Sequence, residues 1–288
     1  RSLLPSGWDK CLPTFPADAK GLATRGSSGK VGTAVAQNVP WLLGGSADLA
    51  PSTKTLLTSE EAGGFQARNY GRRNLHFGIR EHAMAAMING MSLTKVCPFG
   101  ATFFVFTDYL RGGLRLSALM GIPVIYVLTH DSLGVGEDGP THEPIEHLAM
   151  ARATPGLITL RPADANEVVE AWRVVMQLQH EPALLVLTRQ AVPTLDRTKV
   201  APATGLAKGA YVVAEAAGGK PEVLLIGTGS EVYLCMEAQD QLTKEGIKAR
   251  VVSMQSWELF ERQDQAYRDS VLPPGVTARV SVEIGSTF

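Results

Sequence analysis

The 288-residue sequence has only three cysteines, Cys11, Cys97 and Cys235, which are odd in number and far apart. They cannot supply a disulfide framework or a zinc ribbon, and such sparse use favours a reducing, cytoplasmic compartment. The sequence also lacks an apolar run of transmembrane length, and its opening RSLLPSGWDKCLPTFP lacks the apolar core of a signal peptide. We therefore expect no membrane partner.

An excess of charge of either sign is absent as well. Lysine and arginine total 27 against 28 aspartate and glutamate residues, which gives a formal net charge of −1. This balance argues against a nucleic-acid partner, although it allows a local basic pocket. With 45% hydrophobic and 19% charged residues, the chain can bury a sizeable core and is not expected to be disordered.

Strand-like and helix-like segments alternate along the chain. Continuous apolar runs such as 123–129 are typical of parallel strands that are covered on both faces, and amphipathic stretches lie between them. One helix is predicted over 27–39, with Ser27 or Ser28 as its N-cap. We predict an α/β fold, a mostly parallel sheet with helices on both faces, followed by a second α/β domain.

Proline-rich, irregular stretches suggest the domain boundaries. We predict four segments: an arm or linker over 1–20, a first domain over 21–190, a linker over 191–206, and a truncated second domain over 207–288. The sequence begins with arginine rather than methionine and stops just after a buried-strand pattern, so we expect a piece of a longer polypeptide. A plastid location therefore stays open beside the cytoplasmic one.

Ionisable residues gather where predicted strands end, which is where sites lie in open parallel sheets. His130 follows the strand 123–129 and opens a glycine-rich loop that contains Asp138 and His142. Two histidines and several acids in one shaped loop point to a functional site. There are two alternatives: a solvated acidic loop, and a zinc site made by His130, Asp138 and His142.

Three other groups of residues stand out. Glu81 lies in the first turn of a predicted helix, where its position alone fits a residue that complements the helix dipole. Five aromatic residues between Phe99 and Tyr109 form either core or a pocket for a flat heterocycle. Arg25 and Arg189 look like surface charges individually, but with Ser52 and His130 they could hold a phosphate group.

Four long motifs, GGSADLAPSTKT, NLHFGIREHAMAA, THDSLGVGEDGPTHEPIEHLA and LRPADANE, closely resemble transketolase. They match its pyrimidine-binding domain from about residue 20 to 190, and the part from about residue 207 resembles the start of the C-terminal domain. The resemblance implies a three-domain α/β enzyme with thiamine diphosphate bound between two subunits. It acts on sugar phosphates in the pentose phosphate or Calvin pathway, moving a two-carbon ketol unit from xylulose 5-phosphate to ribose 5-phosphate.

The resemblance also implies a role for each candidate residue. Glu81 would hydrogen-bond the aminopyrimidine ring of the cofactor, inside a pocket formed by Phe103, Phe106 and Tyr109, and Asp48 would lie near the cofactor. His142 would lie near the reacting carbons as a hydrogen-bond donor or proton carrier, and Asp138 would contact the C2 hydroxyl. The residues implied for the sugar phosphate are Arg25, Ser52, His130 and Arg189.

The diphosphate-binding domain of that family, with its Mg²⁺ ligands, has no counterpart in this sequence. We therefore expect about half of each active site and no metal ligands of the chain's own. The partner would be a second copy in a homodimer, or a separate domain or subunit that carries the diphosphate site. Three alternatives stay open: a related ketol transferase such as dihydroxyacetone synthase, a non-catalytic assembly module, and a metal hydrolase built on the 130–142 loop.

Overall fold

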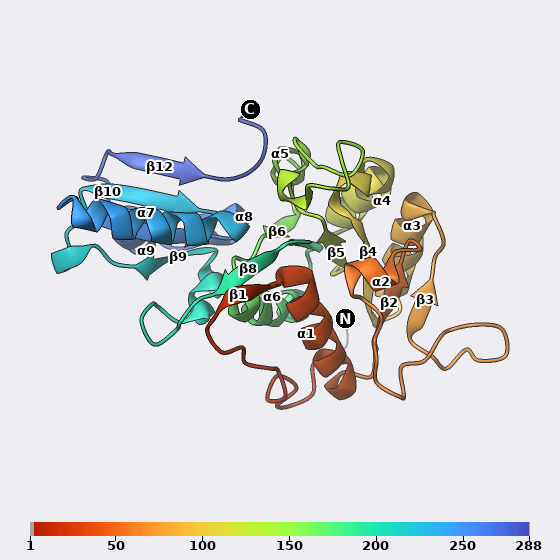
Figure 1. The fold of residues 1–288 in the computed structure, drawn as a ribbon. Coiled ribbons are helices and arrows are strands. Elements are labelled where there is room, and N and C mark those ends of the chain that lie inside the picture. Colours follow the sequence, from red (N-terminus) through yellow and green to blue (C-terminus); the bar gives the residue numbers. More distant parts are fainter. Residues whose placement is uncertain (1–2, 288) are drawn as a thin grey trace.

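The computed structural model describes residues 3–287, which form two α/β units side by side (Figure 1). The first unit is built on a fully parallel six-stranded sheet in the order β3-β2-β4-β5-β7-β6. Its strands are β2 (Leu42–Ser46), β3 (Asn74–His76), β4 (Cys97–Phe103), β5 (Ile125–Thr129), β6 (Ile158–Leu160) and β7 (Ala183–Leu187). This arrangement confirms the predicted parallel α/β fold.

Helices cover both faces of this sheet. α1 (Thr24–Asn38) and α6 (Ala165–Gln177) pack on one face, and α3 (Glu81–Ser92), α4 (Thr107–Met120) and α5 (His147–Arg152) on the other. Every residue of β4, β5 and β7 is buried, which explains why these segments are almost continuously apolar in the sequence. α4 ends at Gly121 in a left-handed conformation, as its sequence predicts.

The order of the strands creates a switch point. The chain passes outward from β2 to β3 and then returns across β2 to β4. The connections from β2 and from β4 therefore leave in opposite directions, and the carboxyl ends of two such strands are the usual place for a ligand in an open α/β sheet. The short helix α2 (Ala50–Thr53) follows β2 at this edge.

The second unit contains a mixed four-stranded sheet in the order β12-β10-β11-β9, with β9 antiparallel to its neighbour. The strands are β9 (Ala210–Ala214), β10 (Val223–Gly227), β11 (Ala249–Met254) and β12 (Arg279–Val282). α7 (Val232–Lys244) packs on one face, while α8 (Trp257–Glu261) and α9 (Gln265–Val271) pack on the other. Short 3₁₀ turns are η1 (Phe104–Phe106), η2 (Leu133–Val135), η3 (Ala203–Lys208), η4 (Ala217–Gly219) and η5 (Gly229–Glu231).

The segments outside the two sheets are more ordered than their sequences suggest. Residues 191–206, expected as a linker, contain β8 (Ala191–Thr194), which pairs antiparallel with β1 (Asp18–Ala23). In the N-terminal arm, Trp8 is buried in the core of the first unit, and Leu4, Leu12 and Phe15 are packed against the same core. The arm and the connecting segment thus belong to the packed structure.

The predicted N-cap of the first helix is wrong. α1 begins at Thr24, so Ser27 and Ser28 lie inside the helix and are buried. Ser28 instead accepts a hydrogen bond of 2.9 Å from the indole N–H of Trp172 on α6. Its hydroxyl therefore holds two helices together on one face of the sheet.

None of the helices in residues 3–287 has the length and apolar character needed to cross a bilayer.

Candidate active site

The residues expected to form a site meet at one edge of the parallel sheet. Asp48 follows β2, Glu81 follows β3, Phe103 ends β4, His130 follows β5 and Arg189 follows β7. Because all these strands run in the same direction, their carboxyl ends lie at the same edge. Residues up to 141 positions apart in the sequence are thereby brought to one surface.

Glu81 is the first residue of α3, and it is 6% exposed. A tight turn precedes it: Gly78 adopts a left-handed φ of +66°, a conformation that favours glycine. The positive end of the helix dipole favours a carboxylate at this position. The Thr102 hydroxyl on β4 donates a hydrogen bond of 3.3 Å to Oε1 of Glu81.

An open pocket of about 660 Å³ lies beside Glu81. Phe106 and Tyr109 form its aromatic wall, and Phe103 stacks on Phe106 with 5.9 Å between ring centroids and 12° between planes. Tyr109 is 65% exposed, so its ring is available to a ligand or to another chain. The remaining lining residues are Ile79, Arg80, His82 and Ala83. A pocket with one buried carboxylate and aromatic walls suits a flat, hydrogen-bonding heterocycle.

His130 is buried, 2% exposed, and its backbone is left-handed with φ +60°. Such a conformation is strained for a non-glycine residue and is often found at functional sites. The imidazole ring packs on Phe103 with centroids 3.6 Å apart, and Nδ1 lies 2.8 Å from the Thr129 hydroxyl. Nε2 lies 3.4 Å from Oδ2 of Asp138.

The pKa of His130 is lowered to about 4. Burial is the largest cause, and the positive charges of Arg25, Arg189 and His142 add to it, while Asp138 acts in the opposite direction. His130 is therefore neutral at physiological pH. The Asp138 carboxylate beside Nε2 favours the tautomer that carries its proton there, in which Nδ1 accepts from the Thr129 hydroxyl.

His142 connects the aromatic pocket with the polar cluster. Its ring meets Phe106 edge-on at 5.4 Å and Phe103 at 5.8 Å, and it is half-buried. The Thr141 hydroxyl lies 2.8 Å from Nδ1 of His142. The loop after β5 thus places His142 beside the pocket and Asp138 beside His130, as one continuous site.

Two arginines complete the polar cluster. Thr24 and Thr188, both buried, exchange backbone-to-hydroxyl hydrogen bonds of 2.9 and 2.7 Å, which fix the start of α1 against the end of β7. Arg25 and Arg189 follow these threonines directly and are held close together. The pKa of Arg25 is lowered, first by burial and then by the charge of Arg189. Two adjacent cations of this kind suit an anionic ligand.

Acidic side chains from the β5 loop already face these arginines. Glu137 forms an ion pair with Nη2 of Arg189, and Oδ2 of Asp138 lies 3.7 Å from Nε. Arg25 donates a 2.8 Å hydrogen bond to the carbonyl oxygen of Ser52. In the sequence, Glu137 is only one of several acids in this loop, and no local pattern distinguishes the four threonines at positions 24, 102, 129 and 188. Only side-chain geometry shows their roles.

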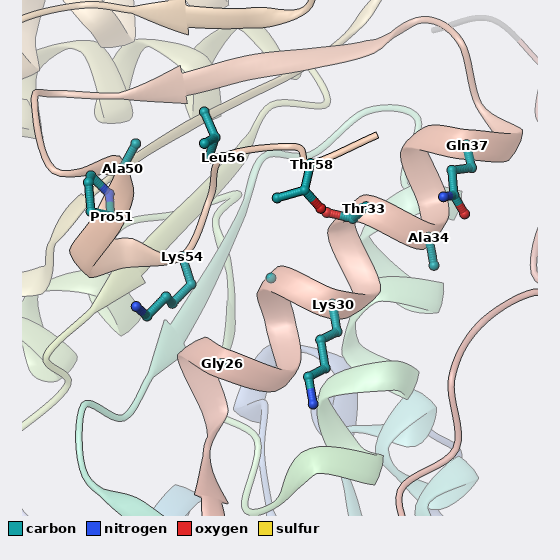
Figure 2. A pocket seen from close by; sticks show the side chains of 11 residues that line it. Gly26, Lys30, Thr33, Ala34, Gln37, Ala50, Pro51, Lys54, Leu56 and Thr58 are labelled. Atoms are coloured by element: carbon teal, nitrogen blue, oxygen red, sulfur yellow. The ribbon is translucent and has the colours of Figure 1, made fainter. Parts of the chain in front are cut away.

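Asp48 and Ser52 both follow β2. Asp48 is exposed, with a left-handed φ of +62°. Next to Ser52, a second pocket of about 610 Å³ opens between α1 and α2 (Figure 2). Lys30 of α1 and Lys54, just after α2, lie on its wall. This pocket has no part in the geometry around Glu81 and His130.

The arrangement of side chains in residues 3–287 does not support the zinc alternative. Across residues 3–287, no group of three or more histidine, cysteine, aspartate or glutamate side chains is arranged to hold a metal ion. Instead, His130 packs on Phe103 and His142 meets Phe106 edge-on. Asp138 lies near Arg189.

Comparison with known families agrees with this geometry. Residues 20–194 match the family described as "Transketolase, pyrimidine binding domain", and residues 209–288 match "Transketolase-like TK C-terminal domain". The chain belongs to the transketolase family. It is 57% identical to a transketolase of Geobacillus stearothermophilus over 288 residues, and 52% identical to a chloroplastic transketolase of Craterostigma plantagineum. These matches cover 99% of this chain but 42% and 54% of the relatives.

Solved transketolase structures show the same relation. Transketolase from Leishmania mexicana superposes with a TM-score of 0.93 at 41% identity, covering 99% of this chain and 41% of that one. A structure titled "Split gene transketolase, inactive beta4 tetramer" superposes with a TM-score of 0.72 at 28% identity, covering 91% of this chain and 80% of that one. This chain therefore spans about two-fifths of most of these transketolases, and a much larger share of the split-gene subunit.

Proposed function

We propose that this chain carries the pyrimidine half of a transketolase active site. The complete enzyme would transfer a two-carbon ketol unit from xylulose 5-phosphate to ribose 5-phosphate. One observation carries this proposal: the buried Glu81 carboxylate in an aromatic pocket shares a sheet edge with a cluster of Arg25, Arg189 and a neutral His130. A cofactor ring and a sugar phosphate could occupy these neighbouring places together.

The pocket fits the aminopyrimidine of thiamine diphosphate. Glu81 would hydrogen-bond a ring nitrogen, with Thr102 holding its other oxygen, and Phe106 and Tyr109 would cover the ring and exclude water. When bound, thiamine diphosphate supplies the electron sink for cleavage next to a carbonyl group. The diphosphate and its Mg²⁺ would be held by a different domain. Asp48 would support the edge of the cofactor site.

The polar cluster fits a sugar phosphate. Arg25 and Arg189 would clamp the phosphate, with Ser52 and the N–H of neutral His130 as additional donors. Asp138 would accept a hydrogen bond from a sugar hydroxyl. His142, between the aromatic pocket and the polar cluster, would donate a hydrogen bond or move a proton at the reacting oxygen.

The proposal includes a partner and a domain division. Residues 21–190 would form the pyrimidine-binding domain and residues 207–288 part of the C-terminal domain, with 1–20 and 191–206 as connecting segments. A second copy, or a separate domain or subunit, would supply the diphosphate half of the site. Since the relatives are bacterial and chloroplastic proteins, we propose a cytoplasmic or plastid setting.

A reconstitution assay tests the proposal. The purified chain is incubated with thiamine diphosphate, Mg²⁺, xylulose 5-phosphate and ribose 5-phosphate, alone and with a diphosphate-binding domain from a relative. We expect ketol transfer only when that domain is added. If neither mixture turns over, the catalytic proposal fails and a non-catalytic assembly role replaces it. Transfer to formaldehyde but not to ribose 5-phosphate would favour dihydroxyacetone synthase activity.

A further inference from the structure

The loop of residues 132–146, which carries Asp138 and His142, is fastened at its start to the second unit. Asp131 directly precedes the loop, and its Oδ2 accepts hydrogen bonds of 3.0 and 2.7 Å from Arg161. Arg161 also pairs with Glu231 and donates to the carbonyl oxygen of Thr228, both in the second unit. All three charged side chains are 2% exposed or less.

The end of the same loop is fastened by residues just after β12. The backbone N–H of Ser286 donates a 2.9 Å hydrogen bond to the carbonyl oxygen of Ile145. Glu283 binds Arg152 of α5 through two parallel hydrogen bonds of 2.7 and 2.6 Å. The Arg152 guanidinium also lies 4.1 Å from the ring centroid of Trp257. Bidentate, partly buried pairs of this kind are among the stronger ion pairs.

The two attachments are connected to each other. The backbone N–H of Ile284 donates a 3.1 Å hydrogen bond to Oε2 of Glu231, the residue that pairs with Arg161. Burial on its own would raise the pKa of Glu283, but Arg152 and Arg161 outweigh it and lower that pKa, so the carboxylate is charged. A continuous polar network thus runs from Asp131 through Glu231 and residues 283–284 to Arg152.

We infer that Glu231 and Glu283 are positioning residues, through which the second unit holds both ends of the 132–146 loop and so sets the places of Asp138 and His142. These two residues touch neither the aromatic pocket nor the cation cluster. His130, strained at φ +60° next to Asp131, depends on the same anchor. The consequence for sugar phosphates rests on the proposed function, but the holding of the loop does not.

Amide hydrogen exchange measured by mass spectrometry tests the holding of the loop in the chain itself. Glu283→Ala should speed exchange across 132–146 about tenfold, because it removes a bidentate anchor. Glu215→Ala is the matched control: Glu215 makes an equally bidentate pair with Arg250, at 2.9 and 2.7 Å, wholly inside the second unit. Unchanged exchange in the loop, or an equal change in the control, would overturn the inference.

Two further measurements complete the test. Should Glu283→Ala fail to fold, Arg152→Gln breaks the same pair from the other side and carries the same expectation. In the reconstituted enzyme, Glu283→Ala should lower kcat/KM for xylulose 5-phosphate about tenfold while leaving the affinity for thiamine diphosphate unchanged. Equal losses of both would mean a merely structural role and would overturn the positioning inference. Absence of turnover in the unsubstituted protein would count against the proposed function, and hydrogen exchange would still decide the positioning role.

Discussion

Because His130 is neutral in the folded chain, the stability of the protein should depend on pH by an amount that follows from the pKa of this residue. The pKa of His130 is about 4 in the folded chain, compared with 6.5 for an ordinary histidine. Between these values the unfolded chain binds a proton that the folded chain does not, so stability falls as pH falls from 6.5 towards 4. Lowering the pH from about 7.5 to about 4.5 should therefore cost roughly 2–3 kcal/mol at this one residue.

Urea unfolding over this pH range measures the effect. Because other groups titrate over the same range, the chain is compared with His130→Gln. Between the same pH values, the free energy of unfolding of His130→Gln should fall by roughly 2–3 kcal/mol less than that of the unsubstituted chain. His180→Gln removes an exposed histidine and should behave like the unsubstituted chain. NMR should place the titration of the His130 ring near pH 4. A midpoint near 6.5, or equal pH dependence in the chain and in His130→Gln, would refute the reasoning.

Three further substitutions test the site and its supports. In the reconstituted enzyme, Glu81→Gln should slow ketol transfer at least about 100-fold with little change in Tm, whereas the exposed Glu146→Gln should not slow it. Thr24→Val should lower the free energy of unfolding by about 1–3 kcal/mol, since the buried backbone N–H of Thr188 loses its acceptor, as chemical denaturation would show. Arg161→Gln should cost about 3–5 kcal/mol in the same measurement, because two buried carboxylates lose their counter-ion.

The sequence predicts the architecture well because periodicity reports burial. The apolar run before His130 can be buried on both faces only in a covered parallel strand, and β5 is such a strand. Local patterns are less informative where tertiary contacts decide the structure. Serine is a common N-cap residue, yet the helix starts before Ser28. The Ser28 hydroxyl instead accepts a hydrogen bond from Trp172. Residues 191–206 look like a linker because the pairing partner of β8 lies far away, in β1.

The candidate site was predictable as a set of positions but not as a set of contacts. Strand ends mark Glu81, His130 and Arg189, since parallel strands share one carboxyl edge. The hydrogen bond to the Glu81 carboxylate comes from Thr102 on β4, which no local pattern contains. The nearness of Arg25 and Arg189 likewise depends on threonines 164 residues apart. The roles that we propose for these residues come from the family resemblance, and only the folded geometry shows which neighbouring residues hold them.

Arg189 and Arg161 both pair with acidic side chains, but these partners differ in how easily they can be replaced. Glu137, which pairs with Arg189, is 73% exposed, and such surface pairs contribute only about 0–1 kcal/mol. A phosphate bound to Arg189 as we propose would therefore displace Glu137 at little cost. Arg161 is buried between two buried carboxylates, and separating them would leave buried charges without a counter-ion. Arg189 is thus suited to exchange ligands, and Arg161 to hold the strained backbone beside His130 in place.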